Sequence, residues 1–303
     1  MEQQAKFDVI IVGGSYAGLS AAMSLGRSLR NVLIIDSGFP CNKQTPHSHN
    51  FITQDGEKPG VIAAKGKAQV LNYKTVKFHK GLVESGKKTE NGFEVITDNG
   101  EKFTAKKLVF ATGIKDIMPD IKGFSECWGI SVIHCPYCHG YEVRNMKTGL
   151  LANAERAFHL SSMISNLTND LTIITNGKAD FTSEQFNTLD KHRISVVENE
   201  VDEIVHENGY VKSILFRDGS IRNLEAIYAV VPFKQHCEVP AILGCEVTAF
   251  GHIKVNDFYK TTIEGVYACG DSTAMMRSVA NAVSAGNMTG AMVNKELTDE
   301  HFL

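Results

Sequence analysis

The stretch that decides the fold is Phe7–Asp36, FDVIIVGGSYAGLSAAMSLGRSLRNVLIID. It reads as a short apolar strand, a glycine-rich turn, a helix and a second apolar strand that ends in Asp36. Gly13 permits a tight turn, and Gly18 lets the helix pack closely against the strand. The free N–H groups at the start of the helix suit a pyrophosphate. Together these features predict a βαβ unit that binds a dinucleotide.

Two positions refine this prediction. Ser15 stands where the dinucleotide fingerprint prefers its middle glycine, and serine is small enough to be tolerated there. Asp36 can accept hydrogen bonds from a ribose 2′-hydroxyl. The alternative is a turn of this kind without a nucleotide, but strand, turn, helix and acid agree with one another here.

A second motif, Gly265-Val-Tyr-Ala-Cys-Gly-Asp271, lies near the end of the chain. A strand that ends in Gly-Asp can present a carboxylate to the ribityl chain of a flavin. The helix expected after it, over 276–297, can direct its N-terminus at the flavin ring and stabilise the reduced, anionic form. For this motif alone, a buried strand that ends in an ordinary turn is the alternative. Combined with the first stretch, the motif predicts FAD as the cofactor.

Another βαβ pattern, of strand, helix and strand, runs from about Thr148 to Thr175. The fold class is therefore predicted as α/β, with two Rossmann-like (ββα-type, FAD- and NAD(P)-binding) domains, the second inserted into the first. The FAD-binding domain is expected to be discontinuous, over 1–117 and 243–303. The inserted, NAD(P)H-binding-like domain is expected over 118–242.

The segment His134-Cys-Pro-Tyr-Cys-His139 in the inserted domain carries redox chemistry. Cys135 and Cys138 fall on one side of a helical turn and can close a disulfide. Pro136 suits the first position of such a turn, and a helix N-terminus with nearby histidines raises the thiolate fraction of a cysteine. Such a dithiol can exchange two electrons with a flavin, and the adjacent His139 can serve as the acid/base.

Two other interpretations of this pair exist. Cys-x-x-Cys is also half of a structural zinc site, but the sequence has no second closely spaced pair and both histidines lie too near the cysteines, so no metal is expected. A pair of inert core cysteines is the other interpretation.

The five remaining cysteines are scattered, which is unlike a secreted disulfide framework and fits a protein of the reducing cytoplasm. They are Cys41, Cys127, Cys237, Cys245 and Cys269.

The composition of the 303-residue chain is that of an ordinary globular protein, with 43% hydrophobic and 21% charged residues. The net charge of −3 and the absence of a long basic run predict no nucleic-acid partner. No apolar run approaches the ~20 residues of a membrane span, so no membrane partner is expected. The first residues, MEQQAKFDVIIVGG, lack the basic region and long apolar stretch of a signal peptide.

The whole chain resembles the low-molecular-weight thioredoxin reductases. The matching features occur in the same order: the FAD fingerprint, Ala111-Thr-Gly113, the Cys-x-x-Cys of the inserted domain and the late Gly-Asp271. The stretch Trp128–Glu142, WGISVIHCPYCHGYE, is most similar to the thioredoxin-reductase-like dithiol oxidases. Those FAD-dependent enzymes close disulfides in dithiol metabolites such as gliotoxin and holomycin. Typical reductases carry Asp directly after the second cysteine, where this chain has His139.

This resemblance implies a homodimer in which Cys138 lies nearer the flavin and Cys135 exchanges with the substrate. His47 and His49 belong to a segment that either lines the substrate face or forms a solvated loop. The residues expected to bind FAD are Gly13, Gly14, Ser15, Ala17, Gly18, Asp36, Asn50, Val83, Ala111, Thr112, Gly113, Gly270, Asp271, Ser278 and Val279.

The inserted domain departs from the reductase pattern at its NADPH turn. A reductase has Gly-x-Gly-x-x-Ala there, and the aligned residues here are Ala152-Asn-Ala-Glu-Arg-Ala157. The methyl of Ala154 stands where the pyrophosphate must approach the backbone, and Glu155 adds negative charge beside it. The next strand is followed by Thr175-Asn-Gly-Lys-Ala-Asp180, with one lysine and no arginine to hold a 2′-phosphate. Weak NADPH binding through a distorted turn is the alternative.

These residues predict an FAD-dependent dithiol/disulfide oxidoreductase that works without NADPH. Its partner is expected to be a small dithiol or disulfide, or a thioredoxin-like protein. Three other functions stay open. They are an NADPH-dependent thioredoxin-disulfide reductase, a reductase that draws electrons from reduced ferredoxin or free flavin, and a non-catalytic flavin-binding redox sensor.

Overall fold

The computed structural model describes residues 6–303, and the chain forms two compact units. The first unit comprises Met1–Lys43, Asn50–Lys115 and Phe233–Leu303, and the second comprises Gln44–His49 and Asp116–Pro232. Residues 1–5 belong to the expected FAD domain and to the start that is expected not to be a signal peptide, and they lie outside the described residues.

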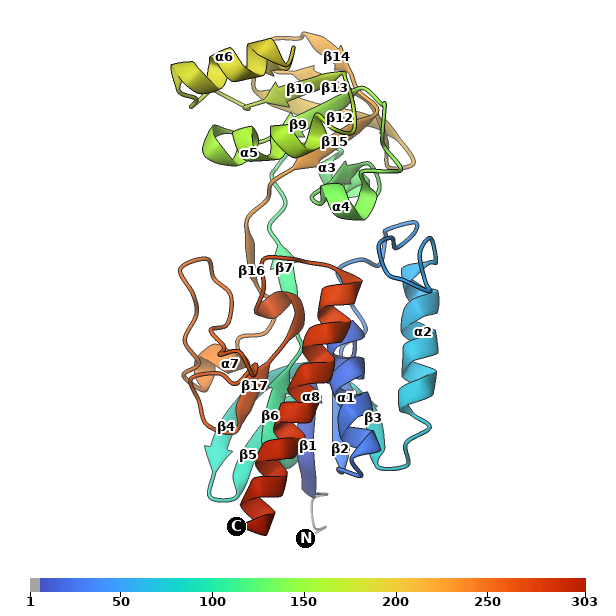
Figure 1. Ribbon diagram of the computed structural model, residues 1–303, viewed down its shortest axis with the longest axis vertical. Helices are drawn as coiled ribbons and strands as arrows, with labels where there is room; N and C mark the ends of the chain where they lie inside the picture. Colours follow the sequence, from blue (N-terminus) through green and yellow to red (C-terminus); the bar gives the residue numbers. More distant parts are fainter. Residues whose placement is uncertain (1–5) are drawn as a thin grey trace. The chain divides into compact units, whose positions relative to one another are not determined.

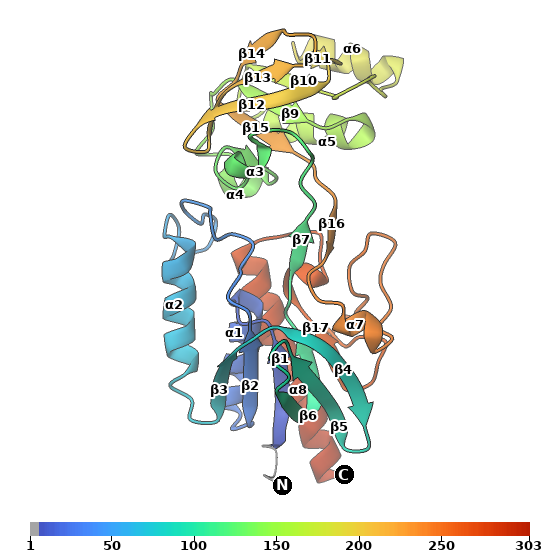
Figure 2. The ribbon, with the colours of Figure 1, turned by 180° about the vertical axis from the view of Figure 1, so that it is seen from behind.

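The first unit is built on a sheet with the strand order β3-β2-β1-β6-β5-β4, and β17 also pairs with β6 (Figure 1). The strands β3, β2, β1, β6 and β17 are parallel, whereas β4 and β5 form an antiparallel hairpin beside β6 (Figure 2). The strands are β1 (Lys6–Val12), β2 (Val32–Asp36), β3 (Val76–Lys80), β4 (Val83–Thr89), β5 (Gly92–Thr97), β6 (Lys102–Phe110) and β17 (Val266–Ala268).

Both faces of this sheet are buried, as expected for parallel strands. Residues that alternate along β1 and β2 pack on one face against α1 and α8 and on the other face against the β4–β5 hairpin. Helices α1 and α8 lie side by side because α8 carries glycines where the two helices meet (Figure 1). A Cβ on Gly286 would overlap the carbonyl oxygen of Ala17. The helices are α1 (Tyr16–Arg27), α2 (Pro59–Val70), α7 (Val239–Ile242), the 3-10 turn η1 (Gly270–Ser272) and α8 (Val279–Phe302).

A buried ionic cluster fixes α8 to the sheet. The Lys107 ammonium lies 2.6 Å from one carboxylate oxygen of Glu296, and Lys260 lies 2.7 Å from the other. The Tyr267 hydroxyl donates to Glu296 as well, at 2.5 Å. Burial opposes ionisation of Glu296, but these hydrogen bonds outweigh it and hold the pKa of the carboxyl at about 2. The Glu296 carboxylate therefore stays ionised between the two lysines through the physiological pH range.

The second unit has a parallel sheet with the order β11-β10-β9-β15-β8. Helices α5 and α6 cover one face of it, and the antiparallel sheet β12-β13-β14 covers the other. Its helices are α3 (Phe124–Cys127), α4 (Pro136–His139), α5 (Ala154–Ile164) and α6 (Ser183–Lys191). Its strands are β8 (Val132–Ile133), β9 (Thr148–Leu151), β10 (Leu171–Ile174), β11 (Ser195–Val197), β12 (Val201–Glu207), β13 (Tyr210–Phe216), β14 (Ile221–Asn223) and β15 (Ala226–Ala229). The chain crosses between the units through β7 (Ile114–Asp116) and β16 (Phe233–Gln235).

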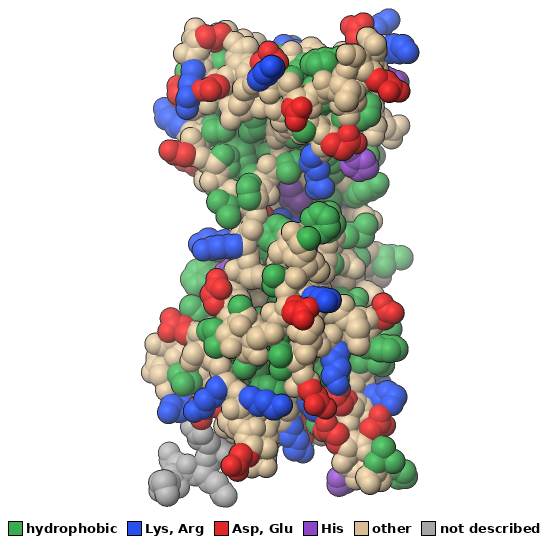
Figure 3. Space-filling model, turned by 90° about the vertical axis from the view of Figure 1, so that its left-hand side faces the viewer, with side chains coloured by type: hydrophobic (Ala, Val, Ile, Leu, Met, Phe, Trp, Pro, Cys, Tyr) green, Lys and Arg blue, Asp and Glu red, His purple; other side chains and the backbone are tan. Residues whose placement is uncertain are grey.

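The predicted α/β class with Rossmann-like units is confirmed by these parallel sheets. Both bounds of the last helix differ from the expected 276–297, since it begins at Val279 and ends at Phe302. Its start is set by Ser278, whose hydroxyl accepts the N–H of Asn281 and so acts as the N-cap. On the face drawn in Figure 3, acidic and basic side chains are interspersed. Among the described residues, every helix is too short or too polar to cross a bilayer.

Candidate functional site

The first dinucleotide turn joins β1 to α1. Gly13 has a φ of +103°, a conformation that suits glycine. A Cβ on Gly18 would overlap the Gly13 carbonyl oxygen, so the fingerprint glycine is required for close packing. Ser15 is the N-cap residue of α1, and its side chain caps none of the helix N–H groups. The start of α1 therefore keeps backbone donors available for an anionic ligand.

Asp36 holds this turn in place. One carboxylate oxygen accepts the N–H of Gly14 at 2.8 Å, and the other accepts the N–H of Gly38 at 3.1 Å. A carboxylate offers about four acceptor positions, so Asp36 keeps capacity for a hydroxyl ligand. Ala17 is buried in the first turn of α1, where it packs close to Gly270.

The other expected flavin residues gather at the same edge of the sheet. Val12, Phe110 and Ala268 are in register at the ends of β1, β6 and β17. Because parallel strands end at one edge, the Gly13 turn, Ala111–Gly113 and Gly270–Asp271 follow them there. A carboxylate oxygen of Asp271 lies 3.7 Å from the Nε of Arg277.

Two buried polar atoms at this edge suit a polar ligand. The hydroxyl of Thr112 and the side-chain carbonyl oxygen of Gln235 are buried without a hydrogen-bond partner among the described residues. Gln235 is fixed by its amide nitrogen, which donates to the backbone oxygens of Gly251 and Ser272. Orphaned buried polar atoms of this kind need a partner, so the edge fits a cofactor with many polar groups, such as FAD. Sequence reasoning missed Gln235, because it belongs to no motif.

The three remaining residues expected to bind the cofactor make contacts of other kinds. Val279 follows the first of them, Ser278, as the first residue of α8. Ser278 caps α8 with its own hydroxyl. Asn50 is exposed, with a φ of +58°, and its N–H donates to Asp55 at 2.7 Å. The Val83 side chain is buried in the core of the first unit. Their contacts with FAD stay predictions.

The cysteine pair lies in the second unit as a closed disulfide between Cys135 and Cys138, with a Cα–Cα distance of 5.3 Å. Cys135 is the N-cap residue of α4, and Pro136 takes the first helical position, as such a turn requires. The N–H of Cys138 lies 3.1 Å from the Cys135 sulfur. Among the described residues no cluster of three metal-ligating side chains occurs.

A set of titratable side chains surrounds this turn. His139 is the last residue of α4, and His49 lies 3.6 Å from the carboxylate of Glu142. Burial lowers the pKa of His139 below its usual value, Glu142 opposes this shift, and His49 adds to it. His139 is therefore neutral at physiological pH and able to accept a proton. No spacing signal marks His49 and Glu142 as neighbours, because they are far apart along the chain.

Of the five other cysteines, Cys41 is exposed and the remaining four are buried. Burial raises the pKa of the Cys127 and Cys237 thiols to about 11 and that of Cys269 to about 12. A buried thiol with a raised pKa is a poor nucleophile. Cys269 is therefore a core residue, in agreement with its position inside the first unit.

The second dinucleotide turn, between β9 and α5, is closed by a side chain. The Asn153 carbonyl oxygen accepts the N–H of Ala154 at 2.8 Å and that of Asp180 at 2.9 Å. The Asn153 amide nitrogen donates to the backbone oxygen of Lys178 at 2.9 Å. Ala154 has a φ of +54°, where glycine is favoured, and Glu155 accepts from Gln185 at 2.7 Å. An anion here would displace these bonds and meet a carboxylate, so the residues do not fit the pyrophosphate of NADPH.

Comparison with known proteins places this geometry in context. Residues 7–286 match the family model of the pyridine nucleotide-disulphide oxidoreductases. A thioredoxin reductase of Claviceps purpurea is 32% identical over 96% of this chain and 94% of its own length. An oxidoreductase structure from Agrobacterium tumefaciens has 36% identity and a TM-score of 0.91, covering 97% of this chain and 99% of its own. A putative thioredoxin reductase structure from Bacillus anthracis has 29% identity and a TM-score of 0.93, with the same coverage.

The match spans both units, and it includes the glycine-rich turn and the cysteine pair. The resemblance to the thioredoxin reductases is thereby confirmed over nearly the whole chain. The chain belongs to the pyridine nucleotide-disulphide oxidoreductase family, as a flavin disulfide oxidoreductase of the thioredoxin reductase type.

Proposed function

We propose that this protein is an FAD-dependent dithiol oxidase, which closes disulfides in its substrate without using NADPH. The observation that carries the proposal is the second nucleotide turn, where the Asn153 side chain accepts the first N–H of α5 and also binds the loop at Asp180. The group of the second unit that can exchange electrons with the flavin is then the Cys135–Cys138 disulfide.

The cofactor would be held in the first unit by the Gly13–Gly18 turn, Asp36, the Thr112 hydroxyl and Asp271. When bound, FAD supplies a two-electron acceptor for the cysteine pair and passes the electrons on to oxygen or another acceptor. The free donors at the start of α1 support this assignment, as does the orphaned Thr112 hydroxyl.

Substrate oxidation proceeds by thiol–disulfide exchange. A substrate thiolate attacks the sulfur of Cys135, a mixed disulfide forms, and Cys138 leaves as a thiolate. The second substrate thiol then attacks the substrate sulfur of the mixed disulfide and releases Cys135. The substrate has lost two electrons and two protons, and the protein pair is a dithiol that must be oxidised again.

His139 directly follows Cys138 and is the residue that we propose accepts the protons released by the substrate thiols. Burial keeps its imidazole neutral at physiological pH, and a neutral imidazole is a base. Glu142 lies beside the same turn and stabilises the protonated form by its charge. We infer that His139 takes a proton as a substrate thiol becomes a thiolate and returns it to solvent.

The surroundings of the cysteine pair favour a small dithiol as the substrate. Tyr137 lies between the two cysteines in the sequence, Tyr141 follows Cys138 by three residues, and each is 69% exposed. Exposed aromatic rings beside a reactive group can contact an apolar substrate at low entropic cost. A thioredoxin-like protein would use the same rings, and it is the alternative partner. Action as a homodimer is also part of this proposal and rests on the resemblance to the reductases. Location in the cytoplasm is part of it too and rests on the scattered cysteines.

Oxygen consumption tests the proposal. With dithiothreitol as the dithiol and no NADPH, we expect continuous oxygen uptake and formation of the cyclic disulfide. An NADPH-dependent reductase would consume NADPH with thioredoxin and leave dithiothreitol largely unoxidised. A ferredoxin- or flavin-driven reductase would need its donor, and a redox sensor would change its absorbance once without turnover.

A further inference from the structure

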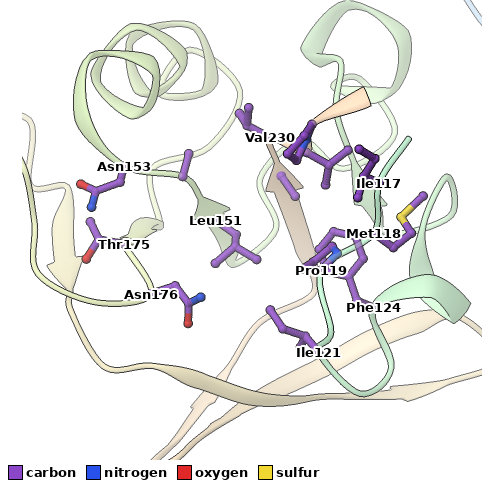
Figure 4. A pocket seen from close by; sticks show the side chains of 14 residues that line it. Ile117, Met118, Pro119, Ile121, Phe124, Leu151, Asn153, Thr175, Asn176 and Val230 are labelled. Atoms are coloured by element: carbon purple, nitrogen blue, oxygen red, sulfur yellow. The ribbon is translucent and has the colours of Figure 1, made fainter. Parts of the chain in front are cut away.

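A pocket of about 340 Å³ opens in the second unit where β9, β10 and β15 end. Its size falls within the roughly 300–1,000 Å³ that is typical of small-molecule sites. Leu151, at the end of β9, and Ile121 point into it from two sides, and Val230 and Met118 contribute further apolar surface (Figure 4). The carboxyl ends of parallel strands are where ligands bind in open α/β sheets. The pocket therefore has the position and size of a ligand site.

The chemistry of the lining is apolar and uncharged. Its side chains are mostly aliphatic, and none of the lining residues in the described chain is charged. The side-chain oxygen and nitrogen of Asn153 both form hydrogen bonds in the closed turn, and the Thr175 hydroxyl donates to backbone oxygens. The Asn176 side-chain oxygen accepts the N–H of Val201, which leaves its NH₂ group as the available donor.

One wall of the pocket is pre-organised by aromatic packing. Phe124, which is fully buried, lines the pocket and stacks on Trp128 with ring centroids 5.6 Å apart. Trp128 stacks in turn on His134 at 5.9 Å, and His134 directly precedes Cys135. A ligand that packs on Phe124 would therefore meet a rigid surface, so little ordering cost would oppose its binding.

We propose that this pocket binds an uncharged, largely apolar ring compound, which takes the place of a pyridine dinucleotide. Burying a phosphate against Leu151 and Ile121 without a cation would cost free energy, whereas burying an apolar ring is favourable. The Asn176 NH₂ group can donate to one acceptor at the rim of such a ring. The proposal concerns binding alone, and it does not depend on the direction of the redox reaction.

The test compares two probes that differ by one phosphate. Binding of 2-naphthol and of 2-naphthyl phosphate to the full-length protein loaded with FAD is measured by equilibrium dialysis at neutral pH. We expect 2-naphthol to bind at one site and its phosphate ester to bind at least about tenfold more weakly. Two variants locate the site. Val230→Trp fills the pocket, and Val205→Trp makes the same change on β12 outside it.

The two valines are matched, since Val230 is 40% exposed and Val205 is 39% exposed. We expect Val230→Trp to weaken 2-naphthol binding at least about tenfold and Val205→Trp to change it less than about twofold. The proposal is overturned if 2-naphthol does not bind, if the phosphate ester binds as tightly, or if Val230→Trp binds it normally. Dithiol oxidation by the same preparations, measured separately, distinguishes failure of this proposal from failure of the oxidase function.

Discussion

The two nucleotide turns of this protein begin alike and differ in how the helix N-terminus is satisfied. In the first unit, Ser15 leaves the first N–H groups of α1 without a side-chain cap, and Gly13 and Gly18 let the backbone close tightly. In the second unit, Asn153 caps α5 with its own side chain and ties the turn to the backbone of the loop that follows β10. Ala154 is held in a glycine-type conformation.

The difference supports the proposal that the second βαβ unit keeps its fold without holding a dinucleotide. A capped helix N-terminus is stable without an anion, whereas an uncapped one needs a partner. The first turn is therefore built for a cofactor, and the second for its own stability. In our proposal the second unit contributes its cysteine pair and the neighbouring His139 to the chemistry.

Substitution of a cysteine should give the largest effect. Cys138→Ser removes the thiolate that leaves during exchange, and we expect dithiol oxidation to fall at least about a thousandfold. FAD content should stay normal, because Cys138 is in the second unit. Cys41→Ser is the control, and its rate should lie within about twofold of the wild type. Full activity in Cys138→Ser would remove the cysteine mechanism.

Adding a methyl group to the first turn should give the next largest effect. In Gly18→Ala the new Cβ overlaps the Gly13 carbonyl oxygen, so we expect a loss of about 3 kcal/mol in the free energy of unfolding, and little bound FAD. Gly60→Ala, in helix α2 where a Cβ meets nothing within 4 Å, should not lower the free energy of unfolding. Denaturation and the flavin absorbance measure both quantities. A stable, yellow Gly18→Ala protein would contradict the account of this turn.

Glycine in the second turn should act in the opposite direction. Ala154→Gly relieves the strain of a φ of +54°, so we expect the free energy of unfolding to rise by about 1 kcal/mol. Ala157→Gly, three residues further along the same helix, should lower it by about 1 kcal/mol. Urea denaturation compares the two. If Ala154→Gly alone allowed NADPH to reduce the flavin, the Asn153 cap would not be what closes the turn.

The smallest predicted effect is a shift in a pH profile. Because the pKa of His139 is lowered, its neutral form persists below the usual histidine pKa of ~6.5, and the oxidation rate should fall only as the pH drops through the lowered value. Glu142 raises that pKa, so Glu142→Gln should move the acid limb to lower pH. Glu203→Gln, in the same unit, should leave the limb in place. A shift toward higher pH in Glu142→Gln would contradict the assignment of His139 as the base.

The local features of the molecule could be predicted from the sequence. The turn at Gly13, the strand before it and the helix after it follow from hydrophobic periodicity and glycine spacing. The helical turn of Cys135 and Cys138 follows in the same way from proline and cysteine spacing. Asn153 precedes a helix, which is a usual N-cap signal, yet its bonds to the loop at Lys178 depend on how β10 lies beside β9.

Features that join distant segments could not be predicted. The contact of His49 with Glu142 and the membership of Gln44–His49 in the second unit arise from chain packing, and no periodic pattern marks them. Gln235 likewise reaches Gly251 and Ser272 across the first unit. Single polar side chains carry no spacing signal, so their partners become visible only in the folded structure.

Anaerobic titration of the flavin absorbance tests the central claim most directly. One equivalent of a dithiol such as dithiothreitol should reduce the flavin of the full-length protein, because the cysteine pair can pass it electrons. One equivalent of NADPH should leave the flavin oxidised, because Asn153 and Glu155 close the second turn to a pyrophosphate. Rapid bleaching of the flavin by one equivalent of NADPH would contradict the account.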